Sequence, residues 1–113
     1  MNIKSRIVKA LVSAAALSAS LWVNAQTYPE KTITVIVPFA AGGPTDTVAR
    51  LIAQSMGNTL KQQLIIENAG GAGGTIGAAR AAKAAPDGYT LFLHHIGQST
   101  APALYRKLSY DAV

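Results

Sequence analysis

The sequence predicts an α/β fold in which a parallel sheet carries helices on both faces. Three short segments of β-branched and apolar residues alternate along the chain with two segments in which apolar residues recur at helical spacing. Glycine-rich loops lead from the first two predicted strands into the helices. Strands that alternate with helices pair in parallel through right-handed crossovers, and the helices then cover the sheet.

The first unit of this fold runs from a strand at residues 32–37 to a helix that starts at Pro44. The strand is β-branched and nearly all apolar, which is typical of a strand buried on both faces. Pro38 ends the strand because proline lacks the N–H group that a strand donates. Proline at the first helical position needs no such group, and Gly57 is the predicted end of the helix.

The second unit consists of a short strand at residues 64–66, a glycine loop at 68–74 and an alanine-rich helix at 75–85. The Pro-Asp-Gly turn at 86–88 then leads to a third strand at 89–93.

The last part of the chain has weaker signals. Residues 94–100 are mostly polar and predict a loop, and a short helical turn is expected near residues 102–105. The chain ends at Val113 without a closing helix or strand, so we expect it to be a fragment of a longer protein.

The first 25 residues have the pattern of a cleavable export signal. Three basic residues precede an almost uncharged run at residues 10–23, and small side chains end at Ala25. The apolar run is shorter than the ~20 residues that a membrane-spanning helix needs. We therefore expect a signal peptide over residues 1–25, cleaved after Ala25, and a mature chain over 26–113 in the bacterial periplasm.

The charge balance and the lack of cysteine exclude several classes of function. The chain has ten Lys and Arg residues against five Asp and Glu, and three of the basic residues lie in the leader, which leaves seven against five. Only Arg106 and Lys107 are adjacent cations in the mature part. A protein that follows a nucleic-acid backbone needs a cluster of cations, so we expect no nucleic-acid partner. Without cysteine, this sequence forms no disulfide and carries no thiolate chemistry.

The candidate binding site lies at the carboxyl ends of the predicted strands, where ligands bind in open parallel sheets. Residues 39–46, 68–75 and 94–100 meet there. Glycine lets the backbone approach a ligand closely, and the exposed N–H groups at a helix start attract a negative group. Two such helix starts would form a receptor for a carboxylate; alternatively, the glycines only make tight strand-to-helix turns. Hydroxyl donors in these loops are Thr45, Thr75, Ser99 and Thr100.

Neither glycine loop carries a phosphate-binding motif. The segment 71–76 puts Ile76 where the dinucleotide fingerprint needs glycine, and no Gly-Lys-Ser/Thr follows. A two-histidine metal site is not expected either, because His94 and His95 end a strand and are predicted to point to opposite faces. One of these two rings is expected to line the cleft. We therefore expect no nucleotide, metal or other cofactor.

Asp46 is the acid nearest the first loop, and it has two interpretations. In the first, its carboxylate caps the helix by accepting backbone N–H bonds, or pairs with Arg50 one turn further on. In the second, it faces the cleft, where it would accept an ammonium group of a ligand or hold water.

A serine hydrolase is the alternative function. Residues 97–101 (GQSTA) follow a strand and resemble the Gly-x-Ser-x-Gly nucleophile elbow, with Ala in the last place. The nucleophile would be Ser99, with its base and acid after Val113. Pro102 fits poorly with the helix that normally backs such an elbow.

Four motifs in order give a more specific indication. Residues 38–50 (PFAAGGPTDTVAR) and 68–77 (NAGGAGGTIG) resemble the two signatures of the substrate-binding proteins of tripartite tricarboxylate transporters, often called Bug-type receptors. Residues 86–91 and 102–111 match the landmarks that follow in these proteins. The resemblance covers Thr27 to Asp111.

The resemblance implies a periplasmic binding protein that is not an enzyme. Its fold would be the two-lobed type II periplasmic-binding-protein (Venus-flytrap) fold, with residues 26–113 as the first part of lobe 1. The ligand would be a small organic acid, such as a di- or tricarboxylate or an amino acid, and the partners would be membrane permease subunits. No cofactor or metal is implied.

In this family, one ligand carboxylate is held by the first two loops with the help of ordered water, and the third loop helps to set selectivity. Matching the motifs residue by residue assigns ligand binding to Phe39, Ala41, Gly42, Gly43, Thr45, Asp46, Gly71, Ala72, Gly73, Gly74, Thr75, Gln98, Ser99 and Thr100.

Overall fold

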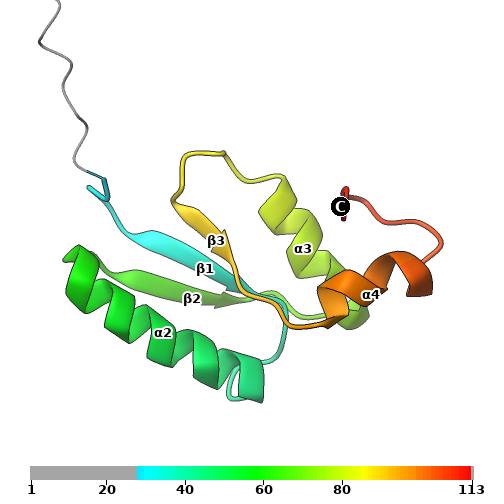
Figure 1. The fold of residues 1–113 in the computed structure, drawn as a ribbon, viewed down its shortest axis with the longest axis horizontal. Coiled ribbons are helices and arrows are strands. Elements are labelled where there is room, and N and C mark those ends of the chain that lie inside the picture. The colour runs from blue at the N-terminus through cyan, green and yellow to red at the C-terminus, as the bar shows by residue number, and fades with distance from the viewer. Residues whose placement is uncertain (1–27, 113) are drawn as a thin grey trace, which may run out of the picture.

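The computed structural model describes residues 28–112, and its centre is a parallel sheet in the order β2-β1-β3 (Figure 1). The strands are β1 (Ile33–Val37), β2 (Leu64–Asn68) and β3 (Thr90–Phe92). The central strand β1 pairs in parallel with both neighbours. The predicted parallel α/β fold is therefore confirmed, whereas the predicted signal peptide lies outside the described residues.

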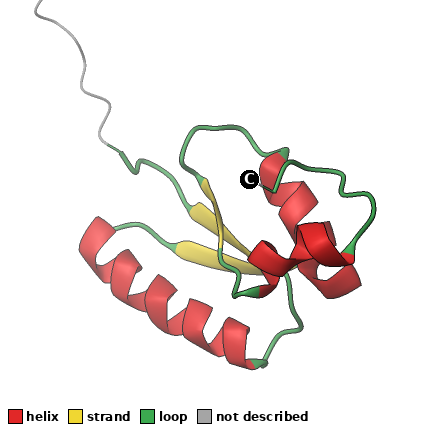
Figure 2. Ribbon diagram, turned by 45° about the vertical axis from the view of Figure 1, so that its right-hand side comes forward, coloured by secondary structure: helices red, strands yellow, loops and turns green. Residues whose placement is uncertain are grey.

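Helices cover both faces of the sheet, as predicted. Helix α2 (Pro44–Leu60) lies on one face and α3 (Thr75–Ala82) on the other (Figures 1 and 2). Side chains alternate along β1, so Val35 and Val37 pack against Ala49 of α2 while Ile36 faces α3. None of the helices between residues 28 and 112 is long and apolar enough to cross a membrane.

Helix α2 is one turn longer than predicted, because Gly57 does not end it. The helix continues to Leu60, and Lys61 ends it in the left-handed conformation with φ 56°. Gly57 has a different role. A Cβ atom at this position would lie 3.1 Å from the carbonyl oxygen of Gln62. The glycine therefore allows the chain to turn back past the helix toward β2.

The predicted loop at residues 94–100 is wrong in its second half. Helix α4 (Gly97–Leu104) begins within it and includes Pro102. The helical turn expected near residues 102–105 is the last part of this helix. Proline in the helix interior leaves one carbonyl without its helical N–H donor, which is why the sequence pattern placed the helix start too late.

The first described residues are attached to the turn that precedes β3. The Tyr28 hydroxyl donates to the Gly88 carbonyl at 2.6 Å, and the Glu30 N–H donates to the Tyr89 hydroxyl at 2.9 Å. These contacts lie at the amino ends of the strands. They leave the opposite edge, where the strands lead into helices, open to solvent or a ligand.

Gly77 offers a test of the packing between α3 and the sheet. An added Cβ would lie 2.8 Å from Cβ of Pro38 and 2.9 Å from the Ala69 carbonyl oxygen. Helix propensity alone predicts that Gly77→Ala stabilises the protein by about 1 kcal/mol. We expect the opposite, a loss of about 1–3 kcal/mol, because the close contact with backbone atoms forces α3 away from the sheet.

Chemical denaturation followed by circular dichroism measures this difference, with Ser55→Ala on the exposed side of α2 as a control for a small change in a helix. A Gly77→Ala protein more stable than wild type would show that the contact between α3 and Pro38 is not tight.

Candidate functional site

The three strand-to-helix loops meet at one edge of the sheet, as the sequence predicted (Figure 1). The Asn68 side chain, at the end of β2, donates to the Phe39 carbonyl in the first loop at 3.0 Å. The Phe39 ring in turn contacts the rings of His94 and His95 in the third loop. Direct contacts therefore join all three loops at the carboxyl ends of the strands.

Asp46 connects the first loop, helix α2 and strand β2 through one buried carboxylate. Its Oδ2 accepts hydrogen bonds from the Gly42 N–H and from Arg50 Nε, each at 2.8 Å. Its Oδ1 accepts from Asn68 Nδ2 at 2.9 Å. The residue is only 1% exposed. We call these four residues, Gly42, Asp46, Arg50 and Asn68, the Asp46 clip.

The charges in the Asp46 clip stabilise one another. The hydrogen bond from Arg50, with smaller contributions from the Gly42 N–H and Asn68, holds the pKa of Asp46 well below its ordinary value of 3.8. The same pair raises the pKa of Arg50. Asp46 is therefore ionised at neutral pH, and the neighbouring guanidinium compensates its charge. The predicted pair with Arg50 is therefore present, whereas the backbone N–H that Asp46 accepts from is that of Gly42, before the helix. Ligand contact by Asp46 stays a prediction.

Asn68 is a residue of this site that the sequence analysis did not identify. Its Nδ2 group bridges the Phe39 carbonyl and the Asp46 carboxylate. The signal for it was a polar side chain at the last position of a strand that begins with three apolar residues, at the start of the glycine loop.

The glycine loop forms a tight turn at the start of α3. The 3-10 turn η1 (Ala72–Gly74) leads directly into this helix, and Gly73 and Gly74 have φ 64° and 96°. A Cβ on Gly74 would lie 2.5 Å from His94 Nε2, and one on Gly73 would lie 2.5 Å from the Tyr105 hydroxyl. Tyr105 is thus a second neighbour of the site that the sequence analysis missed. Both glycines are required by backbone conformation and by close packing.

The starts of α2 and of the η1 turn lack side-chain caps. Neither has a side-chain hydrogen bond to its first N–H groups, whereas the first N–H group of α4, that of Gly97, donates to His95 Nδ1 at 3.0 Å. Such N–H groups carry partial positive charge and attract anions. Two of the predicted hydroxyl donors are already engaged, because Thr75 donates to the Ala72 carbonyl at 2.9 Å and Thr100 to the Gly97 carbonyl at 3.2 Å.

A hollow of about 430 Å³ opens beside the start of α2. Its lining is mostly apolar and consists of Phe39, Ala40, Gly43, Pro44, Thr45 and His95. Five of these residues belong to the first loop at residues 39–46, and His95 comes from the third loop. The hollow therefore lies between two of the loops that the sequence assigned to ligand binding.

The two histidines do not point to opposite faces, which corrects the sequence prediction. Their ring centroids are 4.9 Å apart, and His95 stacks on Phe39 at 4.5 Å while His94 meets the edge of that ring at 5.2 Å. The alternation of a strand does not reach them because β3 ends at Phe92. Burial lowers the pKa of His94, which favours its neutral form.

The remaining predicted residues lie around the same edge. Ala41, Gly42, Gly71 and Ala72 are exposed backbone positions. Ser99 is exposed within α4, and Gln98 is half-buried with a buried Oε1 that has no hydrogen-bond partner. Among the described residues, the Ser99 hydroxyl has no hydrogen bond to a general base.

No group of three or more acidic, histidine or cysteine residues between 28 and 112 is arranged to hold a metal ion.

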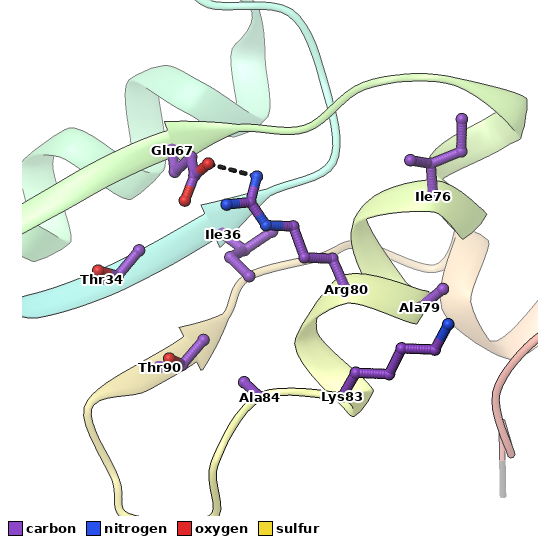
Figure 3. A pocket seen from close by; sticks show the side chains of 9 residues that line it. All are labelled: Thr34, Ile36, Glu67, Ile76, Ala79, Arg80, Lys83, Ala84 and Thr90. Carbon is purple, nitrogen blue, oxygen red and sulfur yellow. Dashed lines mark ion pairs between the residues drawn. The ribbon is translucent and has the colours of Figure 1, made fainter.

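A larger hollow, of about 660 Å³, lies elsewhere, where α3 leaves part of the sheet uncovered (Figure 3). Arg80 of α3 forms an ion pair with Glu67 of β2 across it, and Lys83 extends along its rim (Figure 3). This hollow receives none of the strand-to-helix loops, so it is not part of the candidate site.

Known proteins are similar to this chain in sequence and in fold. Residues 48–113 match the pattern of the tripartite tricarboxylate transporter family receptor. A UPF0065 protein of Agrobacterium vitis, from the TAR-I ttuE-ttuC' intergenic region, is 54% identical over 114 residues, which cover 99% of this chain and 32% of that protein.

Two solved structures have the same fold at high sequence identity. The periplasmic binding protein BugD aligns with a TM-score of 0.73 and 55% identity over 75% of this chain and 28% of its own. MatC from Rhodopseudomonas palustris with bound malate aligns with a TM-score of 0.71 and 56% identity over 75% of this chain and 29% of its own. The predicted fold class is confirmed. The chain spans about a third of the length of the Agrobacterium relative and somewhat less of either solved structure.

Replacing Asp46 with asparagine tests the Asp46 clip through pH. Because the folded-state pKa of Asp46 is depressed, its ionised form stabilises the fold above the ordinary pKa of 3.8, and that stabilisation is lost as the pH falls through the folded-state pKa. We expect Asp46→Asn to lower the thermal midpoint by several degrees at neutral pH. The gap to wild type should close as the pH falls from about 4 toward 2.

Thermal unfolding across this pH range is the measurement. Asp87→Asn is the matched control, since Asp87 forms a largely exposed ion pair with Lys31 at 3.7 Å, and such pairs contribute little. If both variants change the midpoint alike at every pH, the Asp46 clip does not stabilise the fold.

Proposed function

This chain belongs to the tripartite tricarboxylate transporter receptor family, and we propose on that basis that it serves as a periplasmic receptor for a small carboxylate-containing organic anion. It would deliver this ligand to the permease subunits of a tripartite transporter. The leader at residues 1–25 would direct export, in keeping with the periplasmic location of the similar protein BugD.

One observation supports the ligand class most strongly: uncapped helix starts are gathered at the carboxyl edge of the sheet. Their N–H groups favour a negatively charged group. The only carboxylate buried at this edge in the described part of the chain, that of Asp46, is compensated by Arg50. A ligand carboxylate would therefore meet partial positive charge without an opposing free acid. The similar protein MatC is solved with malate, a carboxylate ligand.

The proposed contacts follow the geometry of the two glycine loops. The first loop would present backbone groups at Gly42, Gly43 and Thr45, and the second would present those of residues 71–75. Asp46 would act mainly by holding Gly42 in place. Phe39 and Ala41 would provide the neighbouring apolar surface.

The third loop would contribute through residues 98–100. The buried Oε1 of Gln98 lacks a donor, so a ligand or water N–H or O–H group would satisfy it. Ser99 is exposed and has no competing side-chain hydrogen bond among the described residues. These two side chains would distinguish one organic acid from another.

Residues 26–113 would form the first part of lobe 1 of a two-lobed receptor. The hollow beside α2 is open, so a ligand held by this chain alone would stay largely in contact with water. Closure of a second lobe over the ligand would complete the site. By itself, the chain should bind organic acids only weakly.

The serine hydrolase alternative gains no support from the geometry. Ser99 lies inside the first turn of α4, and four residues separate the end of β3 from that helix. A nucleophile elbow instead places its serine on the sharp turn between strand and helix.

A pair of substitutions at Ala72 tests carboxylate binding. Ala72 is exposed in the glycine loop and has φ 47°, a conformation that both Asn and Asp tolerate. Ala72→Asp adds a negative charge beside the proposed carboxylate, whereas Ala72→Asn adds the same shape without charge. We expect the Asp variant to bind organic acids at least about tenfold more weakly than the Asn variant, because like charges repel at short range.

The measurement is isothermal titration calorimetry with malate and other di- and tricarboxylates. It uses a chimaera in which residues 28–112 replace the matching part of BugD, so that a second lobe is present. A folded chimaera that binds no organic acid, or equal affinities for the two Ala72 variants, would refute a carboxylate site at the glycine loop.

A further inference from the structure

We propose that His95 is a specificity-determining residue of this site, which donates a hydrogen bond from Nε2 to the ligand carboxylate at the start of α2. This inference rests on the proposed function and adds to it a side chain that the sequence motifs did not assign. The position of the ring, its orientation and a lining in which no lysine or arginine of residues 28–112 takes part support this role.

The position of His95 places it on the wall of the hollow beside α2. The same hollow is lined by Gly43 and Thr45, which form the uncapped start of that helix. His95 is exposed, so its ring is accessible to a ligand in the hollow. A carboxylate seated against the first turn of α2 would therefore lie between helix N–H groups and the imidazole.

The orientation of the ring is fixed by two contacts. The Gly97 N–H donates to His95 Nδ1 at 3.0 Å, and the ring stacks on Phe39 with an angle of 17° between the planes. A backbone N–H is only a donor, so Nδ1 accepts, and the proton of the neutral ring is on Nε2. Nε2–H is thus an oriented donor before any ligand binds.

The backbone of His95 is held as well. Its N–H donates to His94 Nδ1 at 2.7 Å, and the His94 ring packs against Phe39 and Phe92. The His94 ring is therefore held between the first loop and strand β3. Because both the ring and the backbone of His95 are restrained, a ligand hydrogen bond costs little further ordering.

The hollow offers no other cationic or imidazole donor. No lysine or arginine of the described chain lines the hollow. Arg50 of α2 carries the guanidinium group that follows the first loop, and it is bound to Asp46. A hydrogen bond to a charged acceptor is stronger than one between neutral groups. His95 is accordingly placed to favour a carboxylate over its neutral amide or ester.

Two substitutions separate hydrogen bonding from packing. His95→Phe keeps an aromatic ring to stack on Phe39 but removes the donor. His95→Gln loses the stacking but keeps an N–H donor of similar reach. Lys83→Gln, at the rim of the separate hollow on the other side of the sheet, is the control for a surface change.

The test uses the BugD chimaera that contains residues 28–112, with calorimetric titration of a dicarboxylate and of its monoamide. We expect His95→Phe to bind the dicarboxylate about tenfold or more weakly, with its preference over the monoamide reduced and its cooperative thermal unfolding retained. His95→Gln should recover part of the affinity, and Lys83→Gln should match wild type.

The outcomes distinguish this inference from the proposed function. A folded wild-type chimaera that binds no acid overturns both. A wild-type chimaera that binds, with His95→Phe equal to it or His95→Gln as weak as His95→Phe, overturns the role of His95 alone.

A measurement on wild type covers the case in which the variants do not fold. In ¹⁵N-labelled protein, His95 Nε2 should carry the proton in the free state, and its resonance should shift when the dicarboxylate is added. A proton on Nδ1, or no shift at saturating ligand, contradicts the inference.

Discussion

The rest of the site depends on the buried carboxylate of Asp46. It receives hydrogen bonds from the first loop, from its own helix and from the end of β2, and so joins segments that are 22 residues apart in the sequence. An unpaired charge in this position would be strongly unfavourable. Because Arg50 compensates the charge, Asp46 holds Gly42 and Asn68 in place without adding a free negative charge where an anion is proposed to bind.

Close packing of glycines sets the position of the second loop relative to this clip. Gly77 brings α3 against Pro38, Gly74 makes room for the His94 ring, and Gly73 makes room for Tyr105. The side chains that fill these spaces come from different elements, so each missing Cβ is matched by an atom from elsewhere in the fold. The glycine-rich composition of the loop therefore serves close packing, one of the two interpretations that sequence alone left open, while the binding of a carboxylate by its backbone N–H groups stays a proposal.

The proposed preference of the site for negative charge requires few charged groups. Helix starts, backbone N–H groups and an oriented imidazole provide partial charges that do not have to move when a ligand binds. Arg50, a full positive charge in α2, is already paired with Asp46 within the fold. An open site of this kind would hold a ligand on one side only, and the matched region is less than a third of either solved chain.

The sequence by itself determined the α/β class, the order of strands and helices and the edge at which the loops meet, because hydrophobic spacing and glycine-rich loops are local signals. Only the tertiary structure decided the role of residues whose local pattern predicted something else. Gly57 accommodates the Gln62 carbonyl instead of ending its helix, α4 begins before Pro102, and His94 and His95 pack on one aromatic ring. Each of these outcomes depends on contacts with residues that no local pattern contains. Asn68, whose partners lie 22 and 29 residues away, is the clearest case.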